Sequence, residues 1–403
     1  MVEKQLEAFL EFSSVSRASL ALFPNWKSWI LQQATTPRTL AKIQLETKEG
    51  LKEASSLTEK MNVLRRFKRR EMVLIGFQDW IQSVSLPTSM KHLSNLAELC
   101  IDFTVQFTIQ RLEQKGQIPS TPFLILGLGK LGGGELNYSS DVDLILLYSE
   151  EGQLTPRLSY HEWFENWGRL FSKEFSYRSE EGGLFRLDLR LRPEGDTGPL
   201  TRSLDSCENY YAAFGETWER LALMKAQRVS GDAELAYDFQ MAMQPFCYPK
   251  NPNPEVLQAV AHLKNRIETE LLNSETRLSD IKRGVGGIRE IEFLLQVHQL
   301  LYGGRHAFLQ EASTLKTLEK LSQTQLIPSE AISQLREAYL FFRRLEHRLQ
   351  MREEAQTHEI PKDSMLRQQI SRSLGFETIE TFDSLCQHHR NRVRYWFENL
   401  ITN

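Results

Sequence analysis

Two apolar segments joined by a glycine-rich stretch constrain the fold of this chain more than any other feature. Residues 121–128 read TPFLILGL, residues 129–140 read GKLGGGELNYSS, and residues 141–148 read DVDLILLY. Short apolar runs bounded by Gly and Ser are typical of buried strands joined by a turn. Side chains two apart on a strand share a face, so Asp141 and Asp143 would point the same way, about 7 Å apart at Cα.

This aspartate pair predicts a magnesium site. Mg²⁺ takes one or two protein carboxylates and completes its shell with phosphate oxygens and water, which a neighbouring glycine loop suits. The alternative is an edge strand that begins with two solvated aspartates after a turn. Carboxylates are depleted in strands, and the apolar run Leu144–Leu147 is typical of a covered strand. These two points favour the metal interpretation.

A second segment, Leu184–Arg192, alternates between apolar and polar residues and predicts a strand along its whole length. Its polar face would carry Arg186, Asp188, Arg190 and Arg192. A purely structural account makes this a solvated face with weak cross-strand ion pairs. The functional account makes Asp188 a third metal carboxylate and the arginines phosphate ligands. The upstream aspartate pair favours the functional account.

A glycine loop, a D-x-D strand and a later strand with one aspartate resemble the nucleotidyltransferase superfamily typified by DNA polymerase β. Several sequence motifs of this chain are similar to those of one family within this superfamily, the glutamine synthetase adenylyltransferases. The segments that carry this resemblance are GLGKLGGGELNYSSDVD (127–143), DLRLRPEGDTGP (188–199), WERLALMKA (218–226) and GGIREIEF (286–293). They lie in order within a resemblance that runs from about Leu64 to Leu315.

The resemblance implies an α+β fold: a polymerase-β-like nucleotidyltransferase core at 116–245, flanked by an N-terminal helical region at 1–115 and a C-terminal helical bundle at 246–403. It also implies two Mg²⁺ ions held by Asp141, Asp143 and Asp188. We expect Lys130 and the backbone amides of the glycine loop to cradle phosphate. The full set of predicted nucleotide and phosphate contacts is Gly129, Lys130, Gly132, Gly133, Gly134, Ser139, Ser140, Arg190, Arg192 and Lys225.

Members of the resembled family usually carry two copies of this unit. One removes AMP from a tyrosine of glutamine synthetase by phosphorolysis, and the other attaches AMP from ATP. This sequence has one copy, in which GGIREIEF and RPEGDTGP resemble the removing copy. The attaching copy tends to have Thr-Asp in place of Arg289 and Glu290. We therefore expect removal of AMP.

The partners implied are glutamine synthetase, a PII-type signal protein, ADP or ATP, and phosphate. Three alternatives stay open: attachment of AMP to glutamine synthetase, nucleotidyl transfer to another acceptor such as RNA, and a catalytically silent module that binds a partner protein. The intact set of three carboxylates argues against the silent module.

Composition narrows these choices. The chain has 403 residues, a net charge of −3 and four scattered cysteines. This length allows two or three domains, and the charge gives no attraction to nucleic acid or acidic membranes. The cysteine spacing suggests neither a disulfide framework nor a zinc site. No signal peptide and no membrane-length apolar run is apparent. We expect a soluble, cytoplasmic protein without nucleic-acid or membrane partners.

Helical periodicity predicts helices up to about residue 115 and again after the turn Asn251–Pro254. Within the first region, the basic cluster Arg65–Arg70 is interpreted as a helix with a solvated basic face, or one facing an acidic partner, rather than a nucleic-acid patch.

Two further helices are predicted. A helix over residues 217–228 would place Lys225 and Arg228 one turn apart, either at the site or as surface cations. A flexible turn at Gly286 would begin the other helix, whose first-turn Glu290 and Glu292 we expect to be structural. The single histidines His298 and His347 are also expected to be structural.

Overall fold

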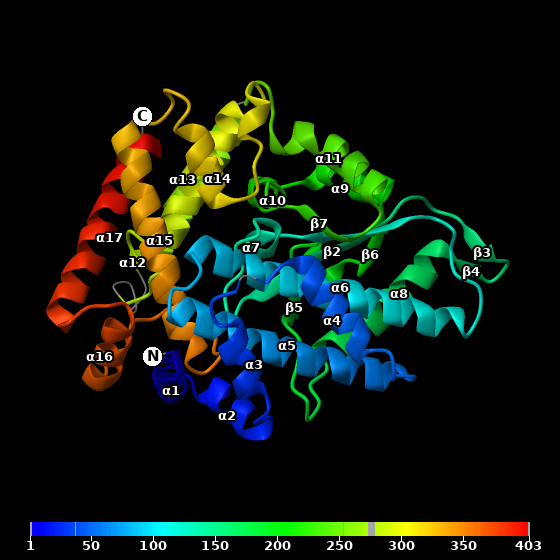
Figure 1. The fold of residues 1–403 in the computed structure, drawn as a ribbon. Helices are drawn as coiled ribbons and strands as arrows, with labels where there is room; N and C mark the ends of the chain where they lie inside the picture. Colours follow the sequence, from blue (N-terminus) through cyan, green and yellow to red (C-terminus); the bar gives the residue numbers. More distant parts are fainter. Residues whose placement is uncertain (1, 37, 253, 273–278, 402–403) are drawn as a thin grey trace. The chain divides into compact units, whose positions relative to one another are not determined.

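The computed structural model describes residues 2–36, 38–252, 254–272 and 279–401 (Figure 1). The chain divides into two compact units by its internal contacts. The first consists of Met1–Glu7, Ser16–Leu136 and Ser140–Phe246, and the second of Ala8–Val15, Asn137–Ser139 and Cys247–Asn403. The sequence-based division at 115 and 245 stays a prediction.

The first unit contains a small mixed sheet that includes both strands predicted around the glycine loop. Its strands are β1 (Phe123–Gly127), β2 (Asp141–Tyr148), β5 (Arg186–Asp188), β6 (Thr201–Ser203) and β7 (Gln227–Gly231). The order is β5-β2-β1-β7, and β6 also pairs with β2. β1 runs antiparallel to β2 and β7, whereas β5 and β6 run parallel to β2. β2 is therefore the central strand, and its side chains from Leu144 to Tyr148 are buried.

Three long helices support this sheet. They are α5 (Leu57–Trp80), α6 (Leu86–Glu113) and α8 (Tyr160–Ser176). α6 packs against α5, α8 and β7, and α8 also contacts β5 and β6. Capping boxes begin α5 at Ser56 and α8 at Ser159, because each serine and the glutamate three residues later satisfy one another's amides. α6 and α8 thus contact the strands that carry the site, and α5 supports them through α6.

Shorter elements complete the first unit. The helices are α1 (Val2–Phe12), α2 (Ser14–Leu22), α3 (Trp26–Gln33), α4 (Leu40–Gly50), α7 (Gly129–Gly132), α9 (Leu204–Phe214), α10 (Thr217–Leu223) and α11 (Ala233–Cys247), of which the later part of α1 and the start of α2 belong to the second unit. A two-stranded ribbon is formed by β3 (Gln153–Thr155) and β4 (Leu158–Ser159).

The named elements among the described residues of the second unit are all helices, and one isolated bridge joins Asp280 to Glu359. Its helices are α12 (Pro254–Leu272), α13 (Ile288–Tyr302), α14 (Thr314–Leu321), α15 (Ser329–Met351), α16 (Ser364–Ser373) and α17 (Ile379–Ile401). Helices α13, α15 and α17 contact one another and form its core. Residue 253 of the predicted boundary turn lies outside the described residues.

The helix predicted after Gly286 is present, and two of the residues expected to be structural, Glu290 and His298, are buried in it. Helix α13 begins at Ile288, and its buried Glu290 forms an ion pair with Arg394 at 3.2 Å. His298 is buried, with Nδ1 2.8 Å from a helix carbonyl. The turn at Gly286 is tightly packed rather than flexible, because a Cβ there would lie 2.2 Å from the carbonyl oxygen of Arg390.

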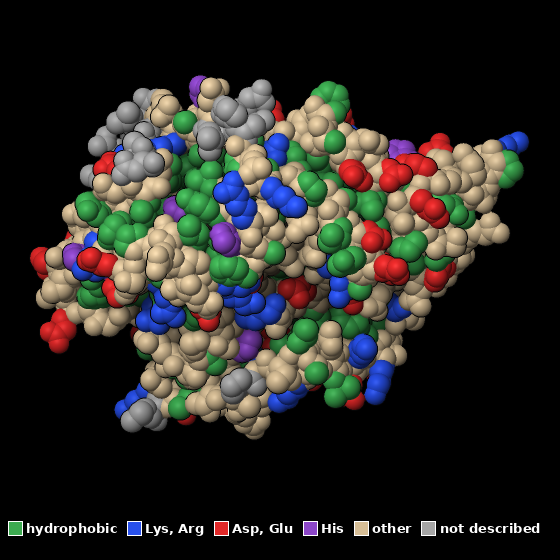
Figure 2. Space-filling view, turned by 90° about the horizontal axis from the view of Figure 1, so that it is seen from above, with side chains coloured by type: hydrophobic (Ala, Val, Ile, Leu, Met, Phe, Trp, Pro, Cys, Tyr) green, Lys and Arg blue, Asp and Glu red, His purple; other side chains and the backbone are tan. Residues whose placement is uncertain are grey.

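The expected solvated basic face of Arg65–Arg70 is wrong for Arg65 and Lys68, whereas Arg66 is exposed and forms an ion pair with Glu181. Arg65 is buried, and its guanidinium donates to the carbonyl of Tyr177 at 3.1 Å. Lys68 is buried as well. Groups of the same chain therefore satisfy cations that the sequence alone places in water. The surface elsewhere carries both signs of charge, as the face in Figure 2 shows.

All four cysteines are buried with free thiols, which agrees with the absence of a predicted disulfide framework. None of the helices in the described ranges is long and apolar enough to cross a membrane.

A buried ion pair between Arg38 and Glu71, in the first unit, leads to a prediction about the stability of the fold. Arg38, 2% exposed, binds the fully buried Glu71 at 2.8 Å and also Glu46 at 2.7 Å. Burial raises the pKa of Glu71, although Arg38 beside it acts in the opposite direction. We expect Arg38→Met to lower the free energy of unfolding by about 3 kcal/mol, because it leaves a buried carboxylate without its main partner. Urea unfolding followed by circular dichroism measures the change.

The matched control is Lys52→Met, which removes an exposed pair with Glu49 at 3.5 Å. Exposed pairs contribute about 0–1 kcal/mol, so this variant should unfold like the parent. Equal losses in the two variants would contradict the importance of the buried pair.

Candidate active site

Strand register brings the predicted carboxylates to two adjacent strands. Asp143 of β2 is the Cα partner of Asp188 of β5, and Asp141 is the partner of Arg186. Residues paired across neighbouring strands point to the same face, as do residues two apart on one strand. The three aspartates therefore share one face of β2 and β5.

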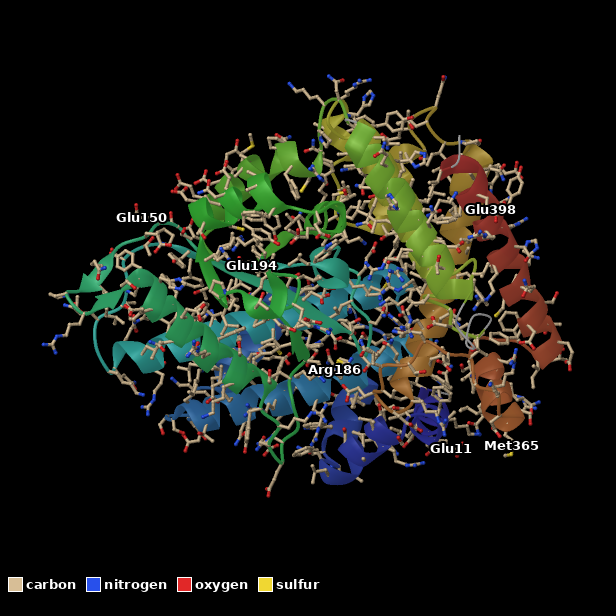
Figure 3. The ribbon with its side chains drawn as sticks, turned by 180° about the vertical axis from the view of Figure 1, so that it is seen from behind. Glu11, Glu150, Arg186, Glu194, Met365 and Glu398 are labelled. Atoms are coloured by element: carbon tan, nitrogen blue, oxygen red, sulfur yellow. The ribbon has the colours of Figure 1, made fainter. Side chains whose placement is uncertain are left out.

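Two arginines already neutralise part of this acidic group. Arg186 Nε donates to Asp141 Oδ1 at 2.6 Å, and Arg190 Nη2 contacts Asp188 Oδ2 at 2.6 Å (Figure 3 labels Arg186). The backbone amide of Arg190 also donates to Asp188, at 2.8 Å. The side-chain bond from Arg190, reinforced by its amide and its charge, holds the pKa of Asp188 below the ordinary value. Asp188 is therefore ionised near neutral pH.

The donor chemistry of this face fits Mg²⁺. Three carboxylates on two neighbouring strands supply the hard oxygen ligands that this ion takes. Within the described part of the chain, no three His, Cys, Asp or Glu side chains converge closely enough to hold a metal ion. At Asp141 and Asp188 the cationic partner in this structure is a guanidinium group instead.

The glycine loop lies directly against the same face. Gly129 has φ +54°, and a Cβ there would lie 2.9 Å from Asp143 Oδ2. A Cβ on Gly132 would lie only 1.8 Å from the carbonyl oxygen of Lys225. Only glycine allows both approaches. The loop thus closes over Asp143 on one side and packs on the Lys225 backbone on the other.

The predicted amide cradle needs revision. The loop winds into the single-turn helix α7, so its later amides donate to carbonyls of the same turn. These bonds run from Gly132 to Leu128 at 3.1 Å, from Gly133 to Gly129 at 3.1 Å and from Gly134 to Leu131 at 2.9 Å. The glycines therefore act by close approach rather than by presenting these amides to phosphate. Lys130 lies half-buried on α7 and stays a predicted phosphate contact.

The two serines before Asp141 differ in their surroundings. Ser139 belongs to the second unit, and its hydroxyl donates to the carbonyl of Glu354 at 2.7 Å. This bond attaches Ser139 to the helical unit, and its predicted phosphate contact stays a prediction. Ser140 is half-buried, belongs to the first unit and stays a predicted contact.

The strand predicted over Leu184–Arg192 is wrong beyond Asp188, where β5 ends. The Asp188 carboxylate accepts the Arg190 amide and turns the chain out of the sheet, as aspartates commonly do. Arg192 is 6% exposed, and its guanidinium donates to the carbonyls of Leu189, Gly198 and Pro199. Arg192 therefore braces the loop that follows β5, whereas Arg190 is exposed beside Asp188.

The helix predicted over 217–228 is also too long. α10 ends at Leu223, and β7 begins at Gln227, opposite Gly127 of β1. Lys225 and Arg228 are therefore not one helical turn apart. Lys225 lies in the intervening turn, largely buried, with its carbonyl oxygen against the glycine loop.

Sequence reasoning missed the residues that anchor this loop from a distance. Ser94 of α6 accepts a hydrogen bond from the amide of Leu136 at 3.0 Å. Gln350 of α15 accepts one from the amide of Ser139 at 2.9 Å. Neither residue stands in a motif, and each is far from its partner along the chain, so no local signal could have found them.

Together, the glycine turn, the D-x-D strand and the in-register Asp188 strand define a nucleotidyltransferase core with flanking helical regions, which confirms the predicted α+β fold class. Residues 3–242 match the family model described as glutamate-ammonia ligase adenylyltransferase, and residues 261–401 match the model described as GlnD PII-uridylyltransferase. The chain belongs to the glutamate-ammonia ligase adenylyltransferase family, which confirms the resemblance seen in the sequence.

Two curated relatives give the extent of the similarity. A bifunctional glutamine synthetase adenylyltransferase/adenylyl-removing enzyme of Nitrosococcus oceani is 39% identical over 363 residues, which cover 88% of this chain and 37% of the relative. A protein of the same description from Methylococcus capsulatus is 38% identical over 349 residues, covering 85% of this chain and 37% of the relative. The chain thus spans little more than a third of the length of these relatives.

Proposed function

We propose that this chain is a Mg²⁺-dependent nucleotidyltransferase that removes AMP from a tyrosine of adenylylated glutamine synthetase. The observation that carries the proposal is the register of β2 and β5, which sets Asp143 opposite Asp188 beneath the glycine loop. This arrangement occurs in a chain whose relatives are described as acting on glutamine synthetase in both directions.

The reaction is an in-line displacement at phosphorus. An oxygen of inorganic phosphate forms a bond to the phosphorus of tyrosyl-AMP, and the bond from that phosphorus to the tyrosine oxygen breaks. The products are ADP and free tyrosine. Such transfers leave the protein little covalent chemistry, so positioning and charge neutralisation dominate.

Each part of the site has a task in this reaction. Asp141, Asp143 and Asp188 would hold two Mg²⁺ ions, whose chemistry when bound is to neutralise charge on the attacking and leaving oxygens. The side chains of Arg186 and Arg190 are 39% and 69% exposed, so their guanidinium groups can reach a bound phosphate. Gly129, without a side chain, allows the Asp143 carboxylate to lie close against the glycine loop. A PII-type signal protein is the proposed regulator, since residues 261–401 match the PII-uridylyltransferase model.

The proposal that this chain removes AMP, rather than attaching it, rests on two sequence segments. Arg289-Glu290 and the segment RPEGDTGP resemble the removing copy rather than the attaching copy. We expect the chain to release ADP from adenylylated glutamine synthetase when Mg²⁺ and phosphate are present, and to do little without phosphate because water is not the nucleophile. With ATP and unmodified glutamine synthetase it should attach no AMP.

Mass spectrometry of the tyrosine-containing peptide of glutamine synthetase reports both directions at once. Loss of the AMP mass supports the proposal. Gain of that mass from ATP would overturn the direction in favour of attachment, and no change in either mixture would contradict transfer to or from glutamine synthetase.

Asp188 allows the metal role to be separated from a structural ion pair with Arg190. We expect Asp188→Ala to lower the rate of AMP removal by at least ~10²-fold, the scale of lost charge stabilisation in a transition state. Its melting temperature should fall only modestly, because the change removes one ion pair with an exposed arginine and one hydrogen bond from the Arg190 amide. Rate assays and calorimetry on Asp188→Ala and Arg190→Ala measure both effects. A destabilised but active Asp188→Ala protein would favour the structural account.

A further inference from the structure

Three residues just before the D-x-D strand belong to a different unit from their neighbours. Asn137, Tyr138 and Ser139 are part of the helical unit, whereas Leu136 and Ser140 belong to the unit that holds the sheet. All three are buried, at 0%, 5% and 3% exposed. Only Ser140 separates them from Asp141, the first residue of β2.

One face of α15 holds these three residues in order. Arg343 Nη2 donates to Asn137 Oδ1. The ring of His347 meets the ring of Tyr138 edge to face, with centroids 5.3 Å apart. Gln350 Oε1 accepts from the Ser139 amide at 2.9 Å. Just beyond the helix, the Glu354 carbonyl accepts from the Ser139 hydroxyl at 2.7 Å. We refer to Arg343, His347, Gln350 and Glu354 as the α15 clasp.

Further contacts of Arg343 within the second unit hold the α15 clasp in place. Arg343 is fully buried, and its other groups reach Tyr339 Oη at 2.7 Å and Glu346 Oε2 at 3.1 Å. Glu346 also contacts His358 Nδ1 at 2.9 Å. A buried guanidinium held at three positions presents one orientation to Asn137, because its planar fork cannot turn without losing several partners.

The backbone at Glu354, the last residue of the clasp, has an unusual conformation. Glu354 has φ +52°, a left-handed conformation that is uncommon for residues other than glycine. Such a conformation persists when the surrounding structure requires it, and here it accompanies the bond from its carbonyl to Ser139.

We propose that Arg343 and Gln350 are positioning residues: through Asn137–Ser139 they set where β2 begins and hence where Asp141 is held, so that transfer depends on the helical unit. The inference rests on the proposed nucleotidyl transfer for its rate effect, but not for its effect on the chain before Asp141. Two residues span at most about 7 Å, so a shift at Ser139 reaches Asp141 with little room to be absorbed. A displacement of about 1 Å in a reacting group can lower a rate by ~10²-fold.

The test removes one hydrogen-bond acceptor without changing the size of the side chain. Gln350→Met leaves the Ser139 amide without the acceptor that Gln350 supplies. We expect kcat for AMP transfer to fall ~10–100-fold with KM within about twofold of the parent, because positioning rather than binding is lost. Hydrogen–deuterium exchange should become faster at residues 138–143. Arg343→Lys keeps the positive charge but removes the planar guanidinium group. It should also lower kcat and speed exchange at residues 138–143.

The control is Leu345→Ala, which creates a cavity at a fully buried position of α15 outside the clasp. It should lower the melting temperature at least as much as Gln350→Met and leave kcat and the exchange of residues 138–143 unchanged. An equal loss of kcat in Leu345→Ala, or parental kcat and exchange in Gln350→Met, would overturn the proposal. If the parent chain transfers no AMP in either direction, the proposed function fails, and exchange at residues 138–143 still decides the inference.

Discussion

Replacing Asp143 by asparagine is expected to abolish nucleotidyl transfer while the protein stays folded. The rate should fall by at least ~10³-fold, because the change removes a metal ligand together with its charge at the reacting phosphate. Asp143 adjoins both other carboxylates of the group, because it lies opposite Asp188 and two residues from Asp141 on β2, and it lies against Gly129. Asp141→Asn should behave in the same way. Circular dichroism and a rate assay at saturating Mg²⁺ measure the two properties.

A matched control is available in Asp205→Asn, the same chemical change at an exposed position in the first turn of α9. It should keep parental activity. Near-parental turnover in Asp143→Asn would refute the assignment of the metal carboxylates.

The second large effect is expected from Gly132→Ala. A Cβ at this position would lie 1.8 Å from the Lys225 carbonyl oxygen and 2.5 Å from that of Gly127. Both obstacles are backbone atoms, so no side chain can move aside and the strands or the loop must shift. We expect a loss of at least ~4 kcal/mol in the free energy of unfolding, at the high end for single substitutions, and no measurable transfer.

Gly116→Ala is the control for this prediction, because nothing lies within 4 Å of a Cβ placed there. Thermal unfolding of both variants makes the comparison. A Gly132→Ala protein as stable as Gly116→Ala would show that the loop does not pack on the Lys225 backbone as described.

The sequence predicted the centre of the fold well because its signals there are local. β1 and β2 appear as the two apolar runs around the glycine loop, and alternation within β2 places Asp141 and Asp143 on one face. The helical character of the C-terminal part follows in the same way from periodicity. The pairing of Asp143 with Asp188 depends on strand register, which the sequence suggested only through the resemblance to a family.

The errors arise where tertiary contacts override a local pattern. Alternation continues to Arg192, but the Asp188 carboxylate captures the Arg190 amide and ends β5. Helical spacing continues past Leu223, but the residues from Gln227 pair with β1 instead.

Two further features depend on partners that no local signal reveals. The cations of Arg65–Arg70 look solvated until partners from elsewhere in the chain, such as the Tyr177 carbonyl, are known. The α15 clasp joins residues more than two hundred positions apart, which no local pattern can show.

That separation has a consequence for how the protein is made. The segment before Asp141 receives its Glu354 partner 215 residues later in the chain, and Ser13 receives the Met351 carbonyl 338 residues later. During synthesis the sheet and its supporting helices can therefore assemble while Asn137–Ser139 still lack their hydrogen-bond partners. Contacts of such long range close late and slow folding. The segment before β2 therefore acquires its full set of hydrogen bonds only after α15 (Ser329–Met351) has been synthesised.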